Sequence, residues 1–396
     1  MRDIKLTRRD AVKGAAATVA VAAAASFGPG AQQAALAAGA VVTGYGVTTS
    51  QLKDWDIMTK TIGLEMKWTG TNADIGTYMR DVISNDLGET HDIFIFDGGT
   101  EDILGPQGYY SVLQEDHPEL TLWDRTSDDW KRTDLLKDRD GVQYGVPVIG
   151  NGDSFGYFPD KIGASADGMD EISFEMLYES EVTRGRCSTD QSWLLSGSEM
   201  AHYLKHHGRV EIEDATDVTG PEMRQVADFA IERKKAGQFR TLHTAFEEQV
   251  QLLANREVDI INCWEPATKN ANLELGAELV KYAFTVEGYY KWGHGAYCHV
   301  KAVERADNLD NVYKMLNYYM SSEYRAYQAE QRGYAGPNMD LGIEYATANG
   351  WDESQIANLA WTEKKVNKKF EKPFFGKPAA IHASEMEEEW QRFLNA

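Results

Sequence analysis

The feature that most constrains the fold is a wholly apolar run at residues 93–96, followed at once by Asp97 and two glycines. This pattern is typical of a strand that is buried on both faces and ends in a loop. Residues 64–68 predict an earlier strand, and residues 75–87 carry apolar side chains near helical spacing between the two strands. A strand–helix–strand order predicts a parallel sheet covered by helices, and therefore an α/β fold.

The same alternation continues along the chain. Residues 41–47 and 258–264 predict strands, and residues 221–237, 245–255 and 309–331 predict helices. The first of these helices begins at a proline and stops at a glycine, which is the usual asymmetry of helix ends. At about 100–200 residues per domain, a chain of 396 residues favours two lobes.

Residues 142–152 predict a connection between these lobes. The segment runs through Pro147 into glycines at positions 150 and 152, which makes it a poor central strand because proline cannot donate to a ladder. We therefore interpret it as a crossover from one lobe to the other.

The first 37 residues differ from the rest of the chain. Arg8 and Arg9 precede a run of small apolar residues at 14–25, and residues 35–37 read Ala-Leu-Ala. Paired arginines, a mildly apolar middle and a small-x-small end indicate a twin-arginine export signal. The apolar run is shorter than the ~20 residues that a membrane-spanning helix needs. We expect residues 1–37 to be removed and the mature chain to be soluble in the periplasm.

The charge of the chain excludes nucleic-acid partners. The net charge is −22, and because five basic and two acidic residues fall within the first 37, the remainder carries −25. Such a chain lacks the clustered basic residues that neutralise phosphates. Its cysteines, Cys187, Cys263 and Cys298, form no C-x-x-C pair. We expect no cofactor and no metal.

Two motifs resemble catalytic or metal-binding sites, but the residues around them do not fit such sites. Residues 152–156 match G-x-S-x-G around Ser154, but Pro159 stands where the helix after a nucleophile elbow should run. We therefore predict no catalytic residue. Glu199 and His202 share a predicted helix with further histidines, but the intervening Glu of H-E-x-x-H is missing, so we favour a solvent-exposed helix face.

Aromatic residues are unusually frequent, with ten tryptophans and nineteen tyrosines. Trp193, Trp264 and Trp292 stand at strand ends or loop starts rather than within helices. Aromatic faces at such positions suit a cleft that holds a cation or an alkyl chain.

Several motifs together resemble the extracellular solute-binding proteins of ABC importers, and most of all the spermidine/putrescine-binding proteins. Residues 144–147 read Tyr-Gly-Val-Pro and precede Gly-Tyr-Phe-Pro-Asp-Lys at 156–161. Trp264 follows a predicted strand, and Trp292 is the last residue of a segment that begins Glu-Gly at 287. Residues 333–338 read G-Y-x-x-P-N. The resemblance spans most of residues 41–396.

The resemblance implies a fold like that of type II periplasmic-binding proteins, with two α/β lobes, a hinge and an interlobe ligand cleft. The lobe boundaries that we expect are residues 38–147 and 285–396 for lobe 1, with the C-terminal helices included, and residues 148–284 for lobe 2.

The resemblance also implies ligand-binding positions. Trp264, Trp292 and Tyr334 match cleft residues of the family, whereas acidic family positions are replaced by Gln191, Leu194 and His294. Buried ammonium groups need carboxylates, since each uncompensated ion costs several kcal/mol. The candidate set comprises the matched residues, possible replacement carboxylates and nearby aromatic or polar groups: Trp264, Trp292, Tyr334, Trp193, Tyr290, Asp97, Glu265, His294, Gln191 and Asp153.

The predicted function is periplasmic capture of a small amine-bearing solute by lobe closure, with delivery to the membrane subunits of an ABC permease. The solute is polyamine-like by resemblance, or a methylated ammonium or zwitterion by the aromatic set, with His294 meeting an anionic end. We expect a monomer. The alternatives are an exported cofactor-dependent or hydrolytic enzyme, and a ligand-loaded partner of a sensor kinase.

Overall fold

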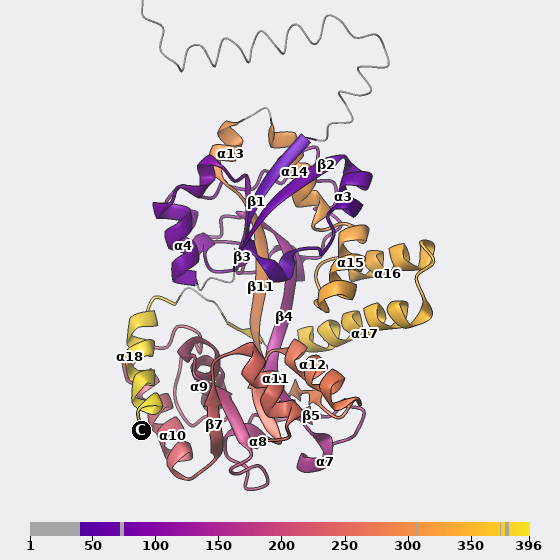
Figure 1. The fold of residues 1–396 in the computed structure, drawn as a ribbon. Coiled ribbons are helices and arrows are strands. Elements are labelled where there is room, and N and C mark those ends of the chain that lie inside the picture. The colour runs from indigo at the N-terminus through magenta and orange to yellow at the C-terminus, as the bar shows by residue number, and fades with distance from the viewer. Residues whose placement is uncertain (1–39, 72–74, 306–307, 373, 377–379) are drawn as a thin grey trace, which may run out of the picture.

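The computed structural model describes residues 40–71, 75–305, 308–372, 374–376 and 380–396. The expected export signal at residues 1–37 lies outside these residues. The described chain forms two lobes that are joined by two long strands, β4 and β11 (Figure 1).

The strands confirm the predicted parallel pattern. Their bounds are β1 Ala40–Val47, β2 Leu64–Thr71, β3 Ile93–Asp97, β4 Gly145–Tyr157, β5 Glu171–Ile172, β6 Cys187–Asp190, β7 Phe239–His243, β8 Ile260–Cys263, β9 Lys281–Tyr282, β10 Phe284–Thr285, β11 Tyr289–Cys298 and β12 Phe374–Phe375. Within the described residues, ten strands form one sheet whose main order is β2-β1-β3-β11-β4-β8-β6-β7, with β12 on β11 and β9 on β4.

Strands β4 and β11 run antiparallel to each other and belong to both lobes; we call them the crossover pair. In lobe 1, β11 pairs with β3 through His294–Cys298, and in lobe 2, β4 pairs with β8 through Ser154–Tyr157. Pro147 therefore lies in a central strand, contrary to our expectation. The register shifts between His294 and Gly295, opposite the stretch that contains Pro147, so the irregularity accommodates the proline.

The carboxyl ends of the parallel strands in both lobes point toward the space between the lobes. Strands β1, β2 and β3 are parallel to one another, as are β6, β7 and β8. Both sets run opposite to the crossover strand that they adjoin. Because β11 runs from lobe 2 to lobe 1 and β4 runs the other way, each set ends at the interlobe side (Figure 1).

Helices pack against the sheet in each lobe, and each lobe has its own buried apolar cluster. Their bounds are α3 Asp56–Ile62, α4 Ile75–Ser84, α5 Glu101–Leu104, α6 Asp128–Lys131, α7 Pro159–Ile162, α8 Glu175–Tyr178, α9 Ser198–His206, α10 Gly220–Lys235, α11 Phe246–Ala254, α12 Glu265–Leu275, α13 Val300–Glu304, α14 Leu309–Tyr318, α15 Ser322–Arg332, α16 Met339–Ala348, α17 Glu353–Phe370 and α18 Ala383–Leu394. Val42, Ile95 and Leu316 share one buried cluster, and Phe155 and Met200 share another.

The helix expected over residues 309–331 is two helices, α14 and α15. The chain turns at Tyr319–Ser321, where the Ser321 hydroxyl accepts a hydrogen bond from the Tyr324 amide and caps α15. A serine that offers such a cap favours a new helix start over continuation.

The C-terminal segment returns from one lobe to the other. Helices α15, α16 and α17 share a buried cluster beside lobe 1, whereas α18 packs on α10 in lobe 2. Met386, Trp390 and Phe393 of α18 belong to the lobe 2 core. The expected boundaries placed α18 with lobe 1, but its apolar face completes the core of lobe 2.

Among the described residues, no helix is long and apolar enough to cross a membrane. The three cysteines are free and buried.

Candidate ligand-binding site

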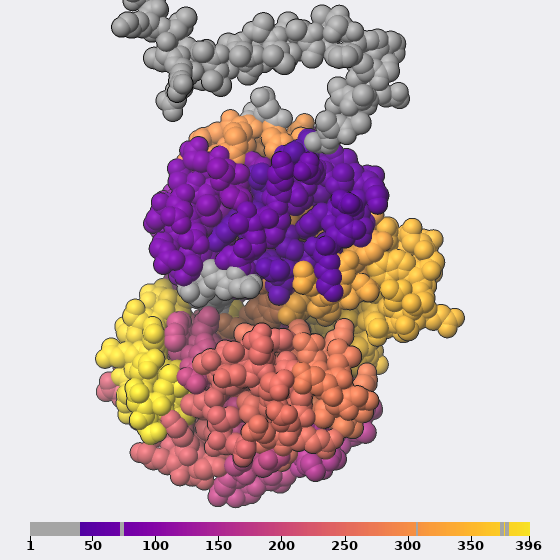
Figure 2. Space-filling model, in the orientation of Figure 1, coloured from indigo at the N-terminus to yellow at the C-terminus, as the bar shows by residue number. Residues whose placement is uncertain are grey.

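The candidate site lies between the lobes, at the facing carboxyl ends of their strands. Asp97 ends β3 in lobe 1, while Asp190 ends β6 and Trp264 follows β8 in lobe 2. The space-filling view shows a hollow between the two lobes (Figure 2). Ligands of open α/β sheets bind at such strand ends because the loops there are free to carry polar groups.

Trp292, Tyr334 and His294 form an aromatic group on the crossover pair. The Trp292 and Tyr334 rings meet edge to face with centroids 5.2 Å apart, and the His294 ring lies 5.2 Å from Trp292. Tyr334 is held by the loop after α15, whose Ala335 forms a bridge with Gly150 of β4. These contacts bring together three predicted residues that are up to 42 positions apart in the sequence.

Both ring nitrogens of His294 have partners within the protein. Its Nδ1 lies 2.7 Å from the Ser50 hydroxyl and its Nε2 lies 3.1 Å from Asp97 Oδ1. His294 is buried, whereas the Asp97 side chain is 37% exposed. The geometry therefore uses His294 to orient Asp97 and leaves neither nitrogen for an anionic ligand group.

Asp153 is a buried carboxyl at the lobe 2 end of the ladder between the two strands of the crossover pair. It pairs across the ladder with Tyr290 and is only 2% exposed. Burial raises the pKa of Asp153 to about 7, while the Trp292 indole and the Lys369 ammonium oppose that rise. Among the described residues, Asp153 forms no ion pair with a lysine or arginine. A cationic ligand would supply the missing charge.

Glu265 is at the edge of the same site, but its charge is already balanced. Lys365 forms an ion pair with Oε1, and Lys369 and Asn151 bond Oε2, each at 3.1 Å. Burial alone would raise the pKa of Glu265, but the two lysines hold it well below its usual range. The Glu265 carboxylate is therefore already paired within the protein, in a cluster of charges that includes Lys365 and Lys369.

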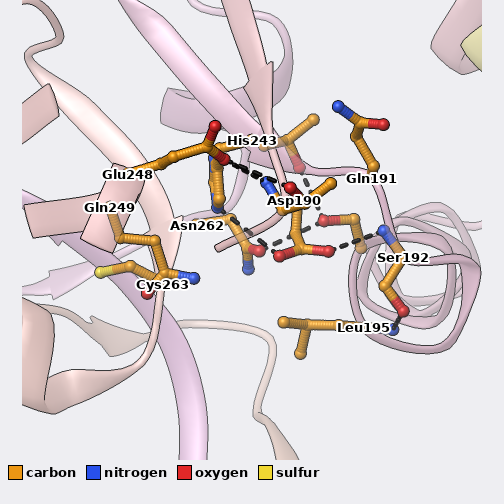
Figure 3. Close-up of polar contacts among 12 residues, drawn as sticks. Asp190, Gln191, Ser192, Leu195, His243, Glu248, Gln249, Asn262 and Cys263 are labelled. Carbon is orange, nitrogen blue, oxygen red and sulfur yellow. Dashed lines mark hydrogen bonds and ion pairs between the residues drawn. The ribbon is translucent and has the colours of Figure 1, made fainter. Parts of the chain in front are cut away.

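Asp190 belongs to a polar cluster at the ends of β6, β7 and β8 (Figure 3). One carboxylate oxygen accepts from the Ser192 amide at 2.6 Å, and the other lies 3.7 Å from His243 Nε2. Burial raises the pKa of Asp190 to about 6 and lowers that of His243 to about 4. In Figure 3 the Gln191 side chain points away from the Asp190 carboxylate, although the two are neighbours in sequence.

Glu199 is a third buried carboxyl, and our sequence interpretation of it was wrong. It is fully buried on α9, where Asn262 Nδ2 donates to its Oε2. Burial raises the pKa of Glu199 well above its usual range, and the charges of Asp153 and Asp190 add to this effect. His202 on the same helix is half-buried and bonds the Glu287 carbonyl at 2.9 Å, so this part of α9 is not a solvent-exposed face.

The remaining predicted aromatics differ in exposure. Trp264 is 36% exposed and stacks on Phe246 at 6.1 Å, beside the cleft. Trp193 packs against the lobe 2 core in the turn before α9. Tyr290 is buried, and after burial itself the charges of Asp97 and Asp153 raise its pKa most.

A shallow, partly open pocket adjoins the crossover pair. Its walls include Trp292 and His294 together with the apolar residues Trp130, Leu136 and Phe370. The surface of the pocket is therefore mainly apolar.

The structure does not support the two alternative chemical sites. Ser154 is buried inside β4 and its hydroxyl donates to the Ala283 carbonyl at 2.8 Å, so it is part of a strand and not of an elbow. In the part of the chain that the structure describes, no group of three or more His, Cys, Asp or Glu residues could hold a metal ion.

Sequence reasoning missed Ser50, Asn151, Glu199, Lys365 and Lys369. The lysines are four residues apart on α17, a spacing that the sequence alone presents as an ordinary basic helix face. Nothing in the sequence indicates that this face meets Glu265, about a hundred positions away.

Comparison with known proteins gives structural matches only. No protein-family description matches the sequence, and no curated protein matches it. Among solved structures, the chain is similar to a putative spermidine/putrescine ABC transporter from Listeria monocytogenes, with 13% identity, a TM-score of 0.63 and coverage of 89% of this chain and 98% of that one.

Two further solved structures are similar over the same extent. The spermidine/putrescine substrate-binding protein PotD of Streptococcus pneumoniae, in complex with calcium and HEPES, has 12% identity and a TM-score of 0.64, covering 89% of this chain and 99% of that one. The binding protein AgtB of Agrobacterium tumefaciens, in complex with agropinic acid, has 14% identity and a TM-score of 0.55, covering 90% and 99%. The chain thus has the mixed α/β fold of type II periplasmic-binding proteins.

Proposed function

We propose that the protein is the solute-binding component of an ABC importer, which captures a small amine-bearing solute between its lobes and delivers it to the permease. The observation that carries the proposal is the position of Asp153, a buried carboxyl that forms no ion pair with a lysine or arginine among the described residues and lies near Trp292 and Tyr334. An ammonium group there would meet a carboxylate and two aromatic rings.

The ligand-binding residues that we propose act in different ways. Asp153, Tyr290, Trp292 and Tyr334 contact the solute, and Trp264 and Trp193 border the cleft from lobe 2. Asp97, His294, Asp190 with Gln191, and Glu265 shape the walls through the contacts described above. The fold supports this proposal, because similar structures carry names of binding proteins for spermidine/putrescine and for agropinic acid.

Export by the twin-arginine route, residence in the periplasm and a monomeric state complete the proposal. The run of paired arginines and the Ala-Leu-Ala end support export. A binding protein that closes around its solute needs no second copy to complete the site.

A thermal-shift screen of residues 38–396 tests the function. The panel holds monoamines, diamines, betaines, amino acids and sulfonates, and a solute present at 100 times its Kd should stabilise the protein by about 2.7 kcal/mol. Trp292→Ala should weaken the response at least tenfold, because it removes a ring beside Asp153. Trp361→Ala is the matched control, since Trp361 is 41% exposed on α17 and does not line the pocket beside the crossover pair. Absence of a response to every class would contradict the proposal.

A further inference from the structure

Lys369 places a primary ammonium group inside the protein, next to the crossover pair. The residue lies in the last turn of α17 and is only 1% exposed. Its Nζ donates to Asn151 Oδ1 at 2.7 Å, to the Gly152 carbonyl at 2.9 Å and to Glu265 Oε2 at 3.1 Å. An ammonium group has three donors, so these acceptors use all of them.

The surroundings of this ammonium are those of a ligand subsite. The centroid of the Tyr282 ring lies 4.8 Å from Lys369 Nζ, and that of the Tyr289 ring lies 5.8 Å away. A carboxylate, neutral oxygens and aromatic faces are the combination that binds alkylammonium groups. The neighbouring lysine on the same helix serves for comparison. Lys368 lies over the Phe284 ring and donates to the Met169 carbonyl, but it forms no ion pair among the described residues.

This subsite adjoins Asp153, where the proposed function puts the solute. Gly152, which accepts from Lys369, is the neighbour of Asp153 in β4, and the Tyr282 hydroxyl lies 3.5 Å from Asp153 Oδ1. Asn151, which also accepts from Lys369, pairs with Trp292 across the ladder. Two positions for ammonium groups thus lie side by side, and one of them is filled by the chain.

We propose that Lys369 fills an ammonium subsite from within, so that the cleft selects a solute with a single cationic end over a diamine. The inference rests on the proposed function, and it specifies that the end of the solute near the crossover pair carries a single ammonium group. That ammonium binds at Asp153. A second one would have to replace Lys369 at Glu265, or lie unpaired near two lysines, where like charges repel at low dielectric.

The subsite can be tested directly by truncating Lys369 and supplying the lost atoms as a small amine. Lys369→Ala removes the atoms of propylammonium, and millimolar propylammonium chloride should raise the melting temperature of this variant by several degrees. The wild type and Lys368→Ala should show a smaller rise than Lys369→Ala, because propylammonium can bind them only at Asp153, and sodium chloride at equal ionic strength is the control for salt. Absence of a specific rise in Lys369→Ala would overturn the subsite, whether or not the wild type binds any solute.

Affinities for two amines of equal carbon number test the selectivity. Calorimetry should show that the wild type binds butylammonium more tightly than 1,4-diaminobutane, and that Lys369→Met, which keeps the volume without the charge, improves diamine affinity at least tenfold. Lys368→Met should keep the wild-type ratio. The gain should vanish when Glu265→Gln is added, because this second change removes the carboxylate that the second ammonium would bind.

The outcomes separate the two proposals. An unchanged monoamine-to-diamine ratio in Lys369→Met overturns the role of Lys369 in selectivity. Rescue of Lys369→Ala by propylammonium, with no amine bound by the wild type, supports the internal subsite and contradicts capture of an amine-bearing solute.

Discussion

Asp153 is the residue whose protonation most directly links stability to ligand binding. Burial raises its pKa to about 7, so near pH 5.5 the folded protein holds a proton that the unfolded chain, with an ordinary aspartate pKa near 4, has released. The free energy of unfolding therefore falls as pH rises from about 4 to about 7, by up to about 1.4 kcal/mol per pH unit. Binding of a cation favours the ionised carboxylate and releases this proton.

We expect amine affinity to rise between pH 5 and pH 7 and to level off above pH 7. Asp153→Asn should remove this dependence and weaken binding, while Asp190→Asn should keep the pH dependence of affinity, since its carboxyl bonds the Ser192 amide within lobe 2. Calorimetry in buffers of different ionisation enthalpy measures the released proton. No proton release by the wild type at pH 6 would argue against Asp153 as the ligand carboxylate.

At this scale, three residues that the sequence put forward as candidate ligand contacts lie near one another: Trp292, Tyr334 and Asp153. The polar partners of the other candidates could not be predicted. Asp97 and Glu265 were candidates for the replacement carboxylates, and in the structure His294 contacts the first and the α17 lysines pair with the second. Such pairings depend on contacts between distant segments, which residue type and local spacing do not encode.

At the scale of elements, helix α18 packs on lobe 2 and contacts the loop at the lobe 2 edge of the candidate site. Trp390 is 1% exposed within the lobe 2 core, and its indole N–H donates to the Gln191 carbonyl at 2.9 Å. Gln191 follows Asp190 at the end of β6, so α18 supports the loop that carries this edge of the site.

We expect Trp390→Phe to destabilise the protein by about 1–3 kcal/mol, because it leaves the Gln191 carbonyl without its donor. Trp390→Ala should cost more, about 3–5 kcal/mol, because it also leaves a cavity. Denaturant unfolding measures both effects. Phe393→Leu, a change in the same helix at a side chain that forms no hydrogen bond, is the control: it should cost less than Trp390→Ala and leave solute affinity unchanged. Equal stability of wild type and Trp390→Ala would contradict the packing of α18 on lobe 2.

Regular elements were predictable where the apolar period was clear, as for β1, β3 and α10. The break between α14 and α15 was missed because apolar residues continue through Tyr319 and Met320, while a single serine cap sets the new start. The central position of β4 was missed because Pro147 argues against it, and only the irregular pairing with β11 makes the proline acceptable.

At the scale of the whole molecule, the net charge bears on the rate of the proposed solute capture. Residues 38–396 carry −25, and the proposed solute is cationic, so the field of the protein attracts it before contact. Long-range attraction acts on the rate of association, while the contacts at Asp153 and Trp292 set the rate of dissociation. At physiological ionic strength the Debye length is only about 8 Å, so salt weakens the first effect much more than the second.

We therefore expect the association rate constant of a monoamine to fall severalfold between about 20 mM and 300 mM sodium chloride, with a much smaller change in its dissociation rate constant. A zwitterion that binds the same site serves as the control, because its net charge is zero and its association should depend little on salt. Stopped-flow tryptophan fluorescence follows both rates through Trp292 at the site. A salt effect that resides mainly in dissociation would show that the charge acts through local ion pairs, and the proposed steering by the whole molecule would then be wrong.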